Sequence, residues 1–164
     1  MEEKKRDWFA DPPPRRIGAL ALIIRGTRVL MVSRPYRTAV SVWGLPGGSA
    51  AANELPRQAV SRHLSDRLAL RATAGRLLVV DHVPEKPGTH REGINFVYGV
   101  EIADDAEPAV TESGGLGEAR WVERADVGFL AVDHARRRIE QCFIAADTNQ
   151  VLDLVLGLPL PTCD

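Results

Sequence analysis

The chain has 164 residues, of which 45% are hydrophobic, and its formal net charge is −1 at pH 7. Such a chain is expected to form one domain with its own core, and a charge near zero gives no electrostatic reason to expect nucleic-acid binding. Two cysteines, Cys142 and Cys163, are too few for a disulfide framework, and no apolar run reaches the length of a membrane span. We therefore expect a cytoplasmic protein that acts away from membranes and nucleic acids.

Residues 1–16 differ in composition from the rest of the chain. They combine a charged start, the aromatic pair Trp8 and Phe9, and three consecutive prolines. Charged and proline-rich ends are typically solvated and extended. We expect a flexible extension here, followed by a domain that spans residues 17–164. Trp8 and Phe9 either pack against the domain, which we favour, or serve a dimer contact.

Two apolar segments, residues 17–24 and 28–33, flank the turn residues 25–27 and predict a β-hairpin. The following loop contains Arg34 and Arg37, which either contact a ligand phosphate or are ordinary exposed arginines. Trp43 either stacks on a base or anchors the loop in the core.

Residues 43–70 form a glycine-rich turn followed by an amphipathic segment. Gly44, Gly47 and Gly48 permit φ > 0 and a close approach of the backbone to a ligand. Pro56 suits the first turn of a helix, and apolar residues recur after it with helical spacing. The sequence therefore predicts a loop and then a helix that begins near Pro56, with residues 63, 66 and 67 sharing one patch of its surface.

This stretch resembles the Nudix box, which reads Gly, five residues, Glu, seven residues, then Arg-Glu-apolar-any-Glu-Glu-any-Gly-apolar. The residues that match are Gly48, Glu54, Arg62, Leu64 and Leu70. The residues that stand in place of the three later glutamates and the final glycine are His63, Asp66, Arg67 and Ala69. The box is therefore degenerate in its acidic core.

The resemblance implies the Nudix fold, an α+β architecture in which a mixed sheet lies between helices as an α/β/α sandwich. It also implies hydrolysis of a nucleoside diphosphate derivative with Mg²⁺ or Mn²⁺, because hard cations bind carboxylates and neutralise phosphate charge. Carried onto this sequence, the metal ligands are Glu54 and Asp66. The alternative for Glu54 is that it is only an acid at the N-terminus of the helix, where its charge complements the helix dipole.

The substituted positions weaken that chemistry. Arg67 repels a cation and attracts a phosphate directly. His63 is a poor Mg²⁺ ligand, and is either a solvated helix residue, a base or a ligand for a softer metal. We expect Mg²⁺ or Mn²⁺ to be weakly bound or absent. The ligand-binding residues are predicted to be Arg34, Arg37, Trp43, Gly47, Gly48, Arg62 and Arg67, with Arg62 more suited to tying the loop to the helix.

Beyond the box, apolar segments predict strands at residues 75–82, 94–102 and 120–122. In the family, a glutamate in the loop before the last of these strands often reaches the metal or acts as base, so Glu112 and Glu118 are either catalytic or exposed. His82 and His90 receive no role. Helices are predicted at about 133–146, with Arg136, Arg137 and Arg138 on a solvated face, and at 149–156, with Val151, Leu152 and Val155 buried.

Two functions remain open. The first is a Nudix-like protein that binds a nucleotide-like diphosphate and has weak or no hydrolysis. The second is an active divergent hydrolase whose catalytic residues are drawn from Glu54, His63, Asp66, Glu112 and Glu118. The resemblance also allows a homodimer.

Overall fold

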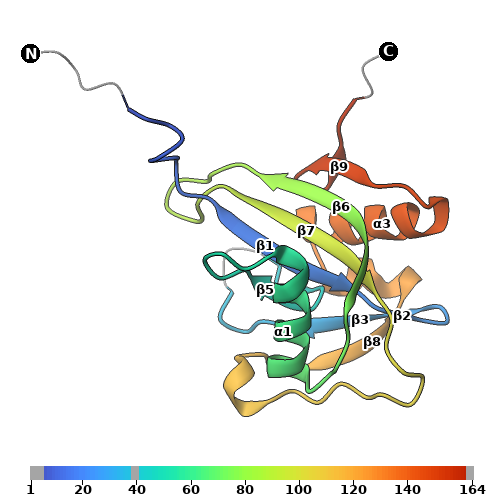
Figure 1. Ribbon diagram of the computed structural model, residues 1–164. Helices are drawn as coiled ribbons and strands as arrows, with labels where there is room; N and C mark the ends of the chain where they lie inside the picture. The colour runs from blue at the N-terminus through green and yellow to red at the C-terminus, as the bar shows by residue number, and fades with distance from the viewer. Residues whose placement is uncertain (1–5, 38–40, 162–164) are drawn as a thin grey trace, which may run out of the picture.

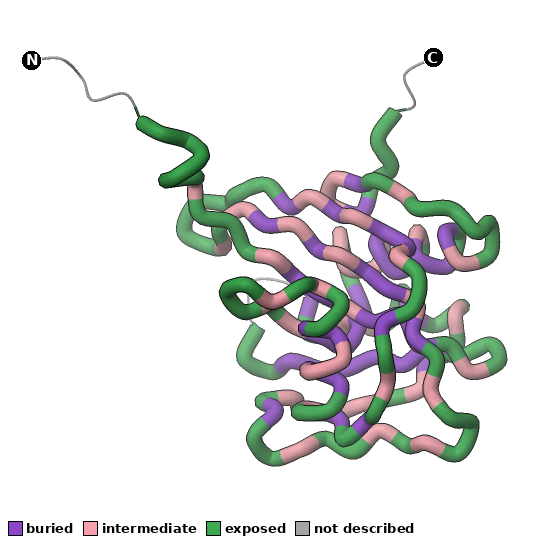
Figure 2. Tube along the Cα trace, viewed as in Figure 1, coloured by how far each residue is buried: buried purple, intermediate pink, exposed green. Residues whose placement is uncertain are grey.

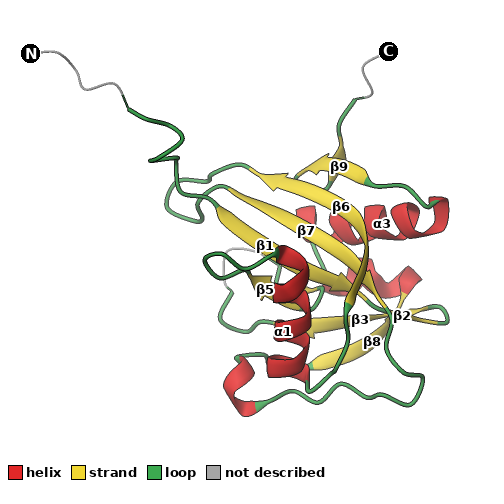
Figure 3. Ribbon diagram, in the orientation of Figure 1, coloured by secondary structure: helices red, strands yellow, loops and turns green. Residues whose placement is uncertain are grey.

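Helices cover both faces of a mixed β-sheet in the computed structural model, which describes residues 6–37 and 41–161 (Figures 1 and 3). The strands are β1 (Arg16–Leu22), β2 (Ile24–Arg25), β3 (Arg28–Ser33), β4 (Trp43–Gly44), β5 (Gly47–Ser49), β6 (Ala74–Val83), β7 (Gly93–Val100), β8 (Ala119–Glu123), β9 (Leu152–Val155) and β10 (Leu158–Pro159). The α-helices are α1 (Pro56–Leu68), α2 (Val127–Leu130) and α3 (Asp133–Thr148), and the 3₁₀ turns are η1 (Glu112–Gly114) and η2 (Arg124–Asp126). This arrangement confirms the predicted α+β fold.

The larger sheet has the strand order β10-β9-β6-β7-β1-β5, and β2, β3, β4 and β8 form a second sheet. Strand β1 pairs with β7 in parallel and with β5 in antiparallel fashion, so the larger sheet is mixed. The hairpin predicted for residues 17–33 is only partly right. Only β2 and the residue before it bond to β3, whereas β1 belongs to the other sheet.

Alternation along the strands builds two apolar cores, because successive side chains of a strand point to opposite faces. On β1, Ala19 and Ala21 join the core under α1, while Leu20 and Leu22 contact the core under α3. Buried residues accordingly concentrate along β1, β6 and β7 (Figure 2). Helix α1 begins at Pro56 as predicted, and the Gln58 side chain accepts a hydrogen bond from the backbone N–H of Leu55 (3.1 Å).

The helix predicted at residues 149–156 is wrong. Helix α3 ends where Asn149 adopts a left-handed conformation, and residues 152–155 form β9, which pairs in parallel with β6. Val151 is 54% exposed, and Leu154 is the buried residue of the strand. The open edge of β6 offers backbone hydrogen bonds that a short isolated helix cannot match, so the tertiary context overrides the local apolar pattern.

Two further expectations are wrong. Trp8 and Phe9 are 63% and 98% exposed, and so they do not pack against the domain. Arg138 does not lie on a solvated face: it is 8% exposed and is paired with Asp81 on β6. It sits four residues before Cys142, on the same stripe of α3 as the buried residues, and this spacing places it inside.

Candidate functional site

The glycine-rich turn connects β4, β5 and α1. Of Gly44, Gly47 and Gly48, only Gly47 has a positive φ (+135°), and a Cβ on it would collide with the backbone of Ala19. Gly48 is required for a different reason, because a Cβ on it would meet the ring of His63. The turn therefore requires glycine at the two positions that pack against β1 and α1.

Glu54 and Arg62 form a two-pronged ion pair. Arg62 Nε donates to Glu54 Oε1 (2.7 Å) and its Nη2 donates to Oε2 (2.8 Å). The Ala51 backbone N–H also donates to Oε2 (2.7 Å). These hydrogen bonds lower the pKa of Glu54 to about 2, and the bond from Arg62 is the largest cause. Arg62 reaches back to the Ser49 carbonyl as well, so this pair ties the loop to α1.

His63 is buried, unlike the solvated helix residue that was one prediction for it. Its Nε2 lies 2.8 Å from the Ser49 carbonyl, which assigns the ring proton to Nε2 and leaves Nδ1 as the acceptor. Burial is the main cause that lowers the pKa of His63, and the charges of Arg67 and Arg62 lower it further. The imidazole is therefore held neutral near pH 7, with one nitrogen committed to the turn.

A small hollow, called here the helix hollow, lies between α1 and η1 and has a volume of about 350 Å³. It is lined by Arg62, His63, Asp66, Arg67, Ser113 and Gly114. The loop is fastened to the end of α1 by Thr111, which donates to the backbone carbonyls of Asp66 (2.6 Å) and Arg67 (3.0 Å).

The predicted acids do not gather in this hollow. Glu112 and Glu118 are exposed, neither lines it, and Glu118 is paired with Arg120 (2.6 Å). In residues 6–37 and 41–161, no three His, Cys, Asp or Glu side chains converge as metal ligands. Among the residues that the structure describes, Asp66 is the one carboxylate of the lining, and it lies beside two arginines. This donor set does not fit the Mg²⁺ or Mn²⁺ that the resemblance implies, because hard cations require several oxygen ligands.

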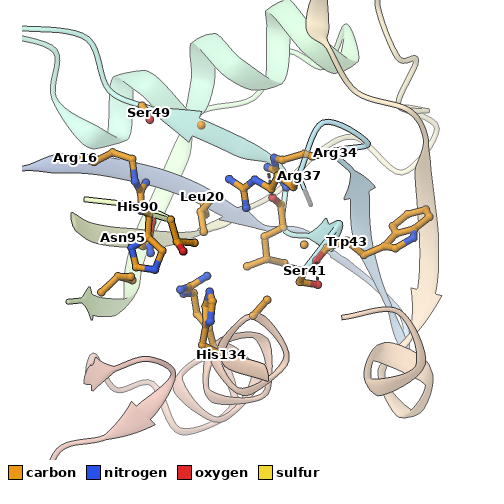
Figure 4. Close-up of a pocket in the computed structure, with 18 of the residues that line it drawn as sticks. Arg16, Leu20, Arg34, Arg37, Ser41, Trp43, Ser49, His90, Asn95 and His134 are labelled. Carbon is orange, nitrogen blue, oxygen red and sulfur yellow. Dashed lines mark hydrogen bonds between the residues drawn. The ribbon is translucent and has the colours of Figure 1, made fainter. Parts of the chain in front are cut away.

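The main cavity, called here the arginine cavity, has a volume of about 400 Å³ and lies between the glycine-rich turn, β1, β7 and the start of α3 (Figure 4). Among the described residues no Asp or Glu lines it. Its cationic lining consists of Arg16, Arg34, Arg37, Arg91 and Arg138. Arg138 is paired with Asp81 behind the wall, and the excess of guanidinium ions over carboxylates favours an anionic ligand.

Arg34 is fixed in the wall of this cavity. It is buried, and its Nη2 donates to the carbonyls of Leu45 (2.8 Å) and Gly47 (3.4 Å). Burial, followed by repulsion from Arg37, lowers the pKa of Arg34 to about 10. A bound anion would relieve the part of this shift that comes from repulsion.

The structure brings together only part of the predicted site. Arg34, Arg37, Trp43 and Gly48 line the arginine cavity, and Gly47 contributes a carbonyl that holds Arg34, whereas Arg62 and Arg67 line the helix hollow. Trp43 also lies under the Arg120 guanidinium, 5.0 Å from the ring centroid. Sequence reasoning missed several lining residues, namely Arg16, His90, Arg91, Asn95, His134 and Arg138.

The comparisons with known proteins support the fold. A family model described as the NUDIX domain matches residues 14–142. A MutT NUDIX hydrolase from Burkholderia pseudomallei is similar at 27% identity and a TM-score of 0.65, over 79% of this chain and 98% of that one. A search of curated proteins finds no match.

Two more distant structures show the same fold alone. An ADP-ribose pyrophosphatase from Streptococcus suis is 12% identical, with a TM-score of 0.62 over 87% of this chain and 99% of that one. A UDP-X diphosphatase is 14% identical, with a TM-score of 0.68 over 87% and 68%. Within the described residues, no helix is both long and apolar enough to cross a membrane.

Proposed function

The chain belongs to the Nudix family, and we propose that it binds a nucleoside diphosphate-linked small molecule in the arginine cavity, with metal-dependent diphosphate hydrolysis weakened or lost. The observation that carries this proposal is the lining of the cavity, which holds five arginines and, among the described residues, no carboxylate. Guanidinium groups bind phosphate oxygens with charge-assisted hydrogen bonds, and two neighbours of similar fold are named for diphosphate substrates.

The weak hydrolysis is supported by the chemistry of the helix hollow. The family places glutamates at positions 63, 66 and 67, and this chain has His63, Asp66 and Arg67 there. A cationic side chain at position 67 opposes a second cation, and both Glu54 oxygens are already bonded to Arg62. Catalysis of diphosphate cleavage at full rate relies on metal ions that neutralise the phosphates.

An active divergent hydrolase is the second candidate. It is favoured by Asp66, which keeps one carboxylate in the helix hollow, and by the 27% identity to a MutT NUDIX hydrolase. In this case Asp66 would hold a metal ion that would neutralise the substrate phosphates, and the base would be Glu112, Glu118 or His63.

One experiment separates the two functions. Binding of ADP-ribose and UDP-glucose is measured by calorimetry with EDTA and with Mg²⁺ or Mn²⁺, and products are analysed in parallel. We expect saturable binding in EDTA without product. Turnover of about 1 s⁻¹ or faster, the lower end of ordinary enzymes, would establish the hydrolase, and no binding under any condition would refute the proposal.

A pair of variants links binding to the cavity. Arg37→Gln removes an exposed cavity arginine and is expected to weaken binding about tenfold, as loss of one charge-assisted hydrogen bond does. Arg71→Gln removes an exposed arginine outside the lining and is the matched control. Equal affinities for both variants would place the ligand elsewhere.

Adding carboxylates to the helix hollow tests the proposed reason for weak metal binding. His63→Glu combined with Arg67→Glu raises the carboxylates of the helix hollow from one to three. We expect Mg²⁺ to raise the melting temperature of this variant and not that of the parent, because a ligand that binds the native state stabilises it. Arg71→Glu, which adds an acid outside the hollow, controls for general charge. A folded double variant that ignores Mg²⁺ would show that the loss of metal binding is not local.

A further inference from the structure

The arginines of the cavity come from different elements. Arg34 and Arg37 follow β3 and lie beside the glycine-rich turn, whereas Arg16 begins β1 and Arg138 lies on α3. In Figure 4, Arg34 and Arg37 enter the cavity from one side, while Arg16, His90 and Asn95 gather on the other, with Leu20 between the groups. The distal arginine site is defined here as Arg16 and its partner Asn95, together with His134 and Arg138, which line the same cavity from α3.

The distal arginine site is a built arrangement. Arg138 Nε donates to Asp81 Oδ2 (2.5 Å), and the fully buried Asp81 also accepts the Gly157 backbone N–H (2.9 Å). Arg16 Nη2 donates to Asn95 Oδ1 (3.1 Å). Each guanidinium is therefore held by a partner on a central strand, and Asp81 acts as a positioning residue for Arg138.

The charges of this site are not balanced. Asp81 offsets one of its two guanidinium ions, and the partner of Arg16 is a neutral amide. Partial burial and repulsion from Arg138 and Arg37 lower the pKa of Arg16. Repulsion between fixed cations costs free energy in the empty cavity, and a bound anion removes that cost.

Helix α3 begins beside the site, where the carboxylate of Asp133 in its first turn offsets part of the positive charge of the helix end. His134 and Ala135, in its first turn, line the cavity next to Arg138. The N-terminal end of a helix carries partial positive charge and favours an anion. Burial, followed by repulsion from Arg138, lowers the pKa of His134, which leaves its ring neutral and able to donate or accept a hydrogen bond.

We infer that the distal arginine site binds a second anionic group of the ligand, a carboxylate or a phosphate, separate from the diphosphate held near Arg34 and Arg37. The preferred ligand is then a nucleoside diphosphate derivative whose other substituent is itself negatively charged. The identity of the diphosphate part rests on the proposed function, whereas the anion site at Arg16 and Arg138 stands on its own geometry.

Two matched pairs of ligands test this inference. UDP-glucuronate differs from UDP-glucose by a carboxylate, and ADP-ribose 1″-phosphate differs from ADP-ribose by a phosphate on the terminal ribose. We expect at least one member with the extra anionic group to bind about tenfold or more tightly than the partner that lacks it, as one charge-assisted contact provides. The pair that shows the preference identifies the anion. Equal affinities within both pairs would overturn the inference while leaving the proposed function intact.

A matched pair of variants assigns the preference to the site. Arg16→Gln should abolish the preference for the member with the extra anionic group, measured as the ratio of the two affinities within a pair. Arg15→Gln is the control, because this neighbouring arginine pairs with Glu92 and does not line the cavity. Arg138→Lys, which keeps the charge but loses the planar fork, should reduce the preference in part. A preference that survives Arg16→Gln would refute the assignment.

Inorganic phosphate provides a test that needs no nucleotide. We expect the arginine Nε–Hε resonances of Arg16 and Arg138 in NMR spectra to shift saturably as phosphate is added at constant ionic strength. Arg34 should titrate with its own affinity. If no nucleoside diphosphate derivative binds but Arg16 and Arg138 respond to phosphate, the proposed function fails and the anion site holds. If Arg16 and Arg138 do not respond in the folded protein, the inference fails.

Discussion

A Cβ atom added at Gly48 would lie 2.6 Å from Cε1 and Nε2 of His63. The same Nε2 is 2.8 Å from the Ser49 carbonyl, so the ring is held against the strand that carries the glycine. In this chain the box glycine therefore serves the packing of a histidine as well as the shape of the turn. His63 consequently acts as a link between α1 and β5.

We expect Gly48→Ala to lower the free energy of unfolding by about 1–3 kcal/mol, the usual cost of overpacking a buried contact. Adding His63→Ala should recover part of that loss, because the ring that opposes the new methyl group is gone. Urea denaturation of the two single variants and the double variant measures the coupling. Gly99→Ala, where the nearest heavy atom is 3.7 Å away, is the matched control. Strictly additive effects would contradict the predicted contact.

At the scale of single elements, the end of α1 carries a strained residue. Ala69 occupies the position of the box glycine and adopts φ 52° and ψ 27°, in the left-handed region. Its backbone N–H still bonds to the Leu64 and Ser65 carbonyls, so the helix ends in the geometry that a glycine would favour. The fold keeps this conformation although the Cβ of alanine makes it sterically unfavourable.

Ala69→Gly is expected to raise the free energy of unfolding by about 0.5–1 kcal/mol, since relief of the left-handed strain exceeds the added flexibility of the unfolded chain. Thermal and urea denaturation both measure the change. Ala146→Gly in the right-handed interior of α3 should instead cost about 1 kcal/mol. A loss of stability in Ala69→Gly would show that the cap carries no strain.

Across the whole molecule, Asp81 joins three parts of the chain that are distant in sequence. It lies on β6, pairs with Arg138 on α3, and accepts the N–H of Gly157 in the turn between β9 and β10. This buried pair fixes α3 against the sheet and places Arg138 in the wall of the arginine cavity. Stability and the shape of the site thus depend on the same ion pair.

Removal of one partner of the Asp81–Arg138 pair should lower the free energy of unfolding more than removal of both. Asp81→Ala leaves a buried guanidinium without its carboxylate and is expected to cost about 3–5 kcal/mol of unfolding free energy. Asp81→Leu with Arg138→Met should cost less, because neither charge remains in the core. Arg136→Ala, which breaks the exposed pair with Glu140, should cost at most about 1 kcal/mol and serves as the control. Urea denaturation decides, and equal losses for the single and double variants would contradict this account.

Local patterns were sufficient for much of this protein. The spacing of Gly48, Glu54 and Arg62 indicated the family, and helical periodicity after Pro56 predicted α1 within two residues of its observed end. The strand at residues 75–82 was predicted in the same way and is confirmed as part of β6. These features follow from the sequence because periodicity and box spacing are properties of neighbouring residues.

Contacts between distant residues were not available from such patterns. Residues 152–155 carry the apolar character of a short helix and become β9 because the edge of β6 lies next to them. Arg16 and Asn95 meet because β1 pairs in parallel with β7, and Arg138 is buried because Asp81 lies opposite it. A hydrogen-bonded sheet edge or a buried counter-charge overrides local preference. Neither contact produces a periodic pattern in the sequence of the segment that it places.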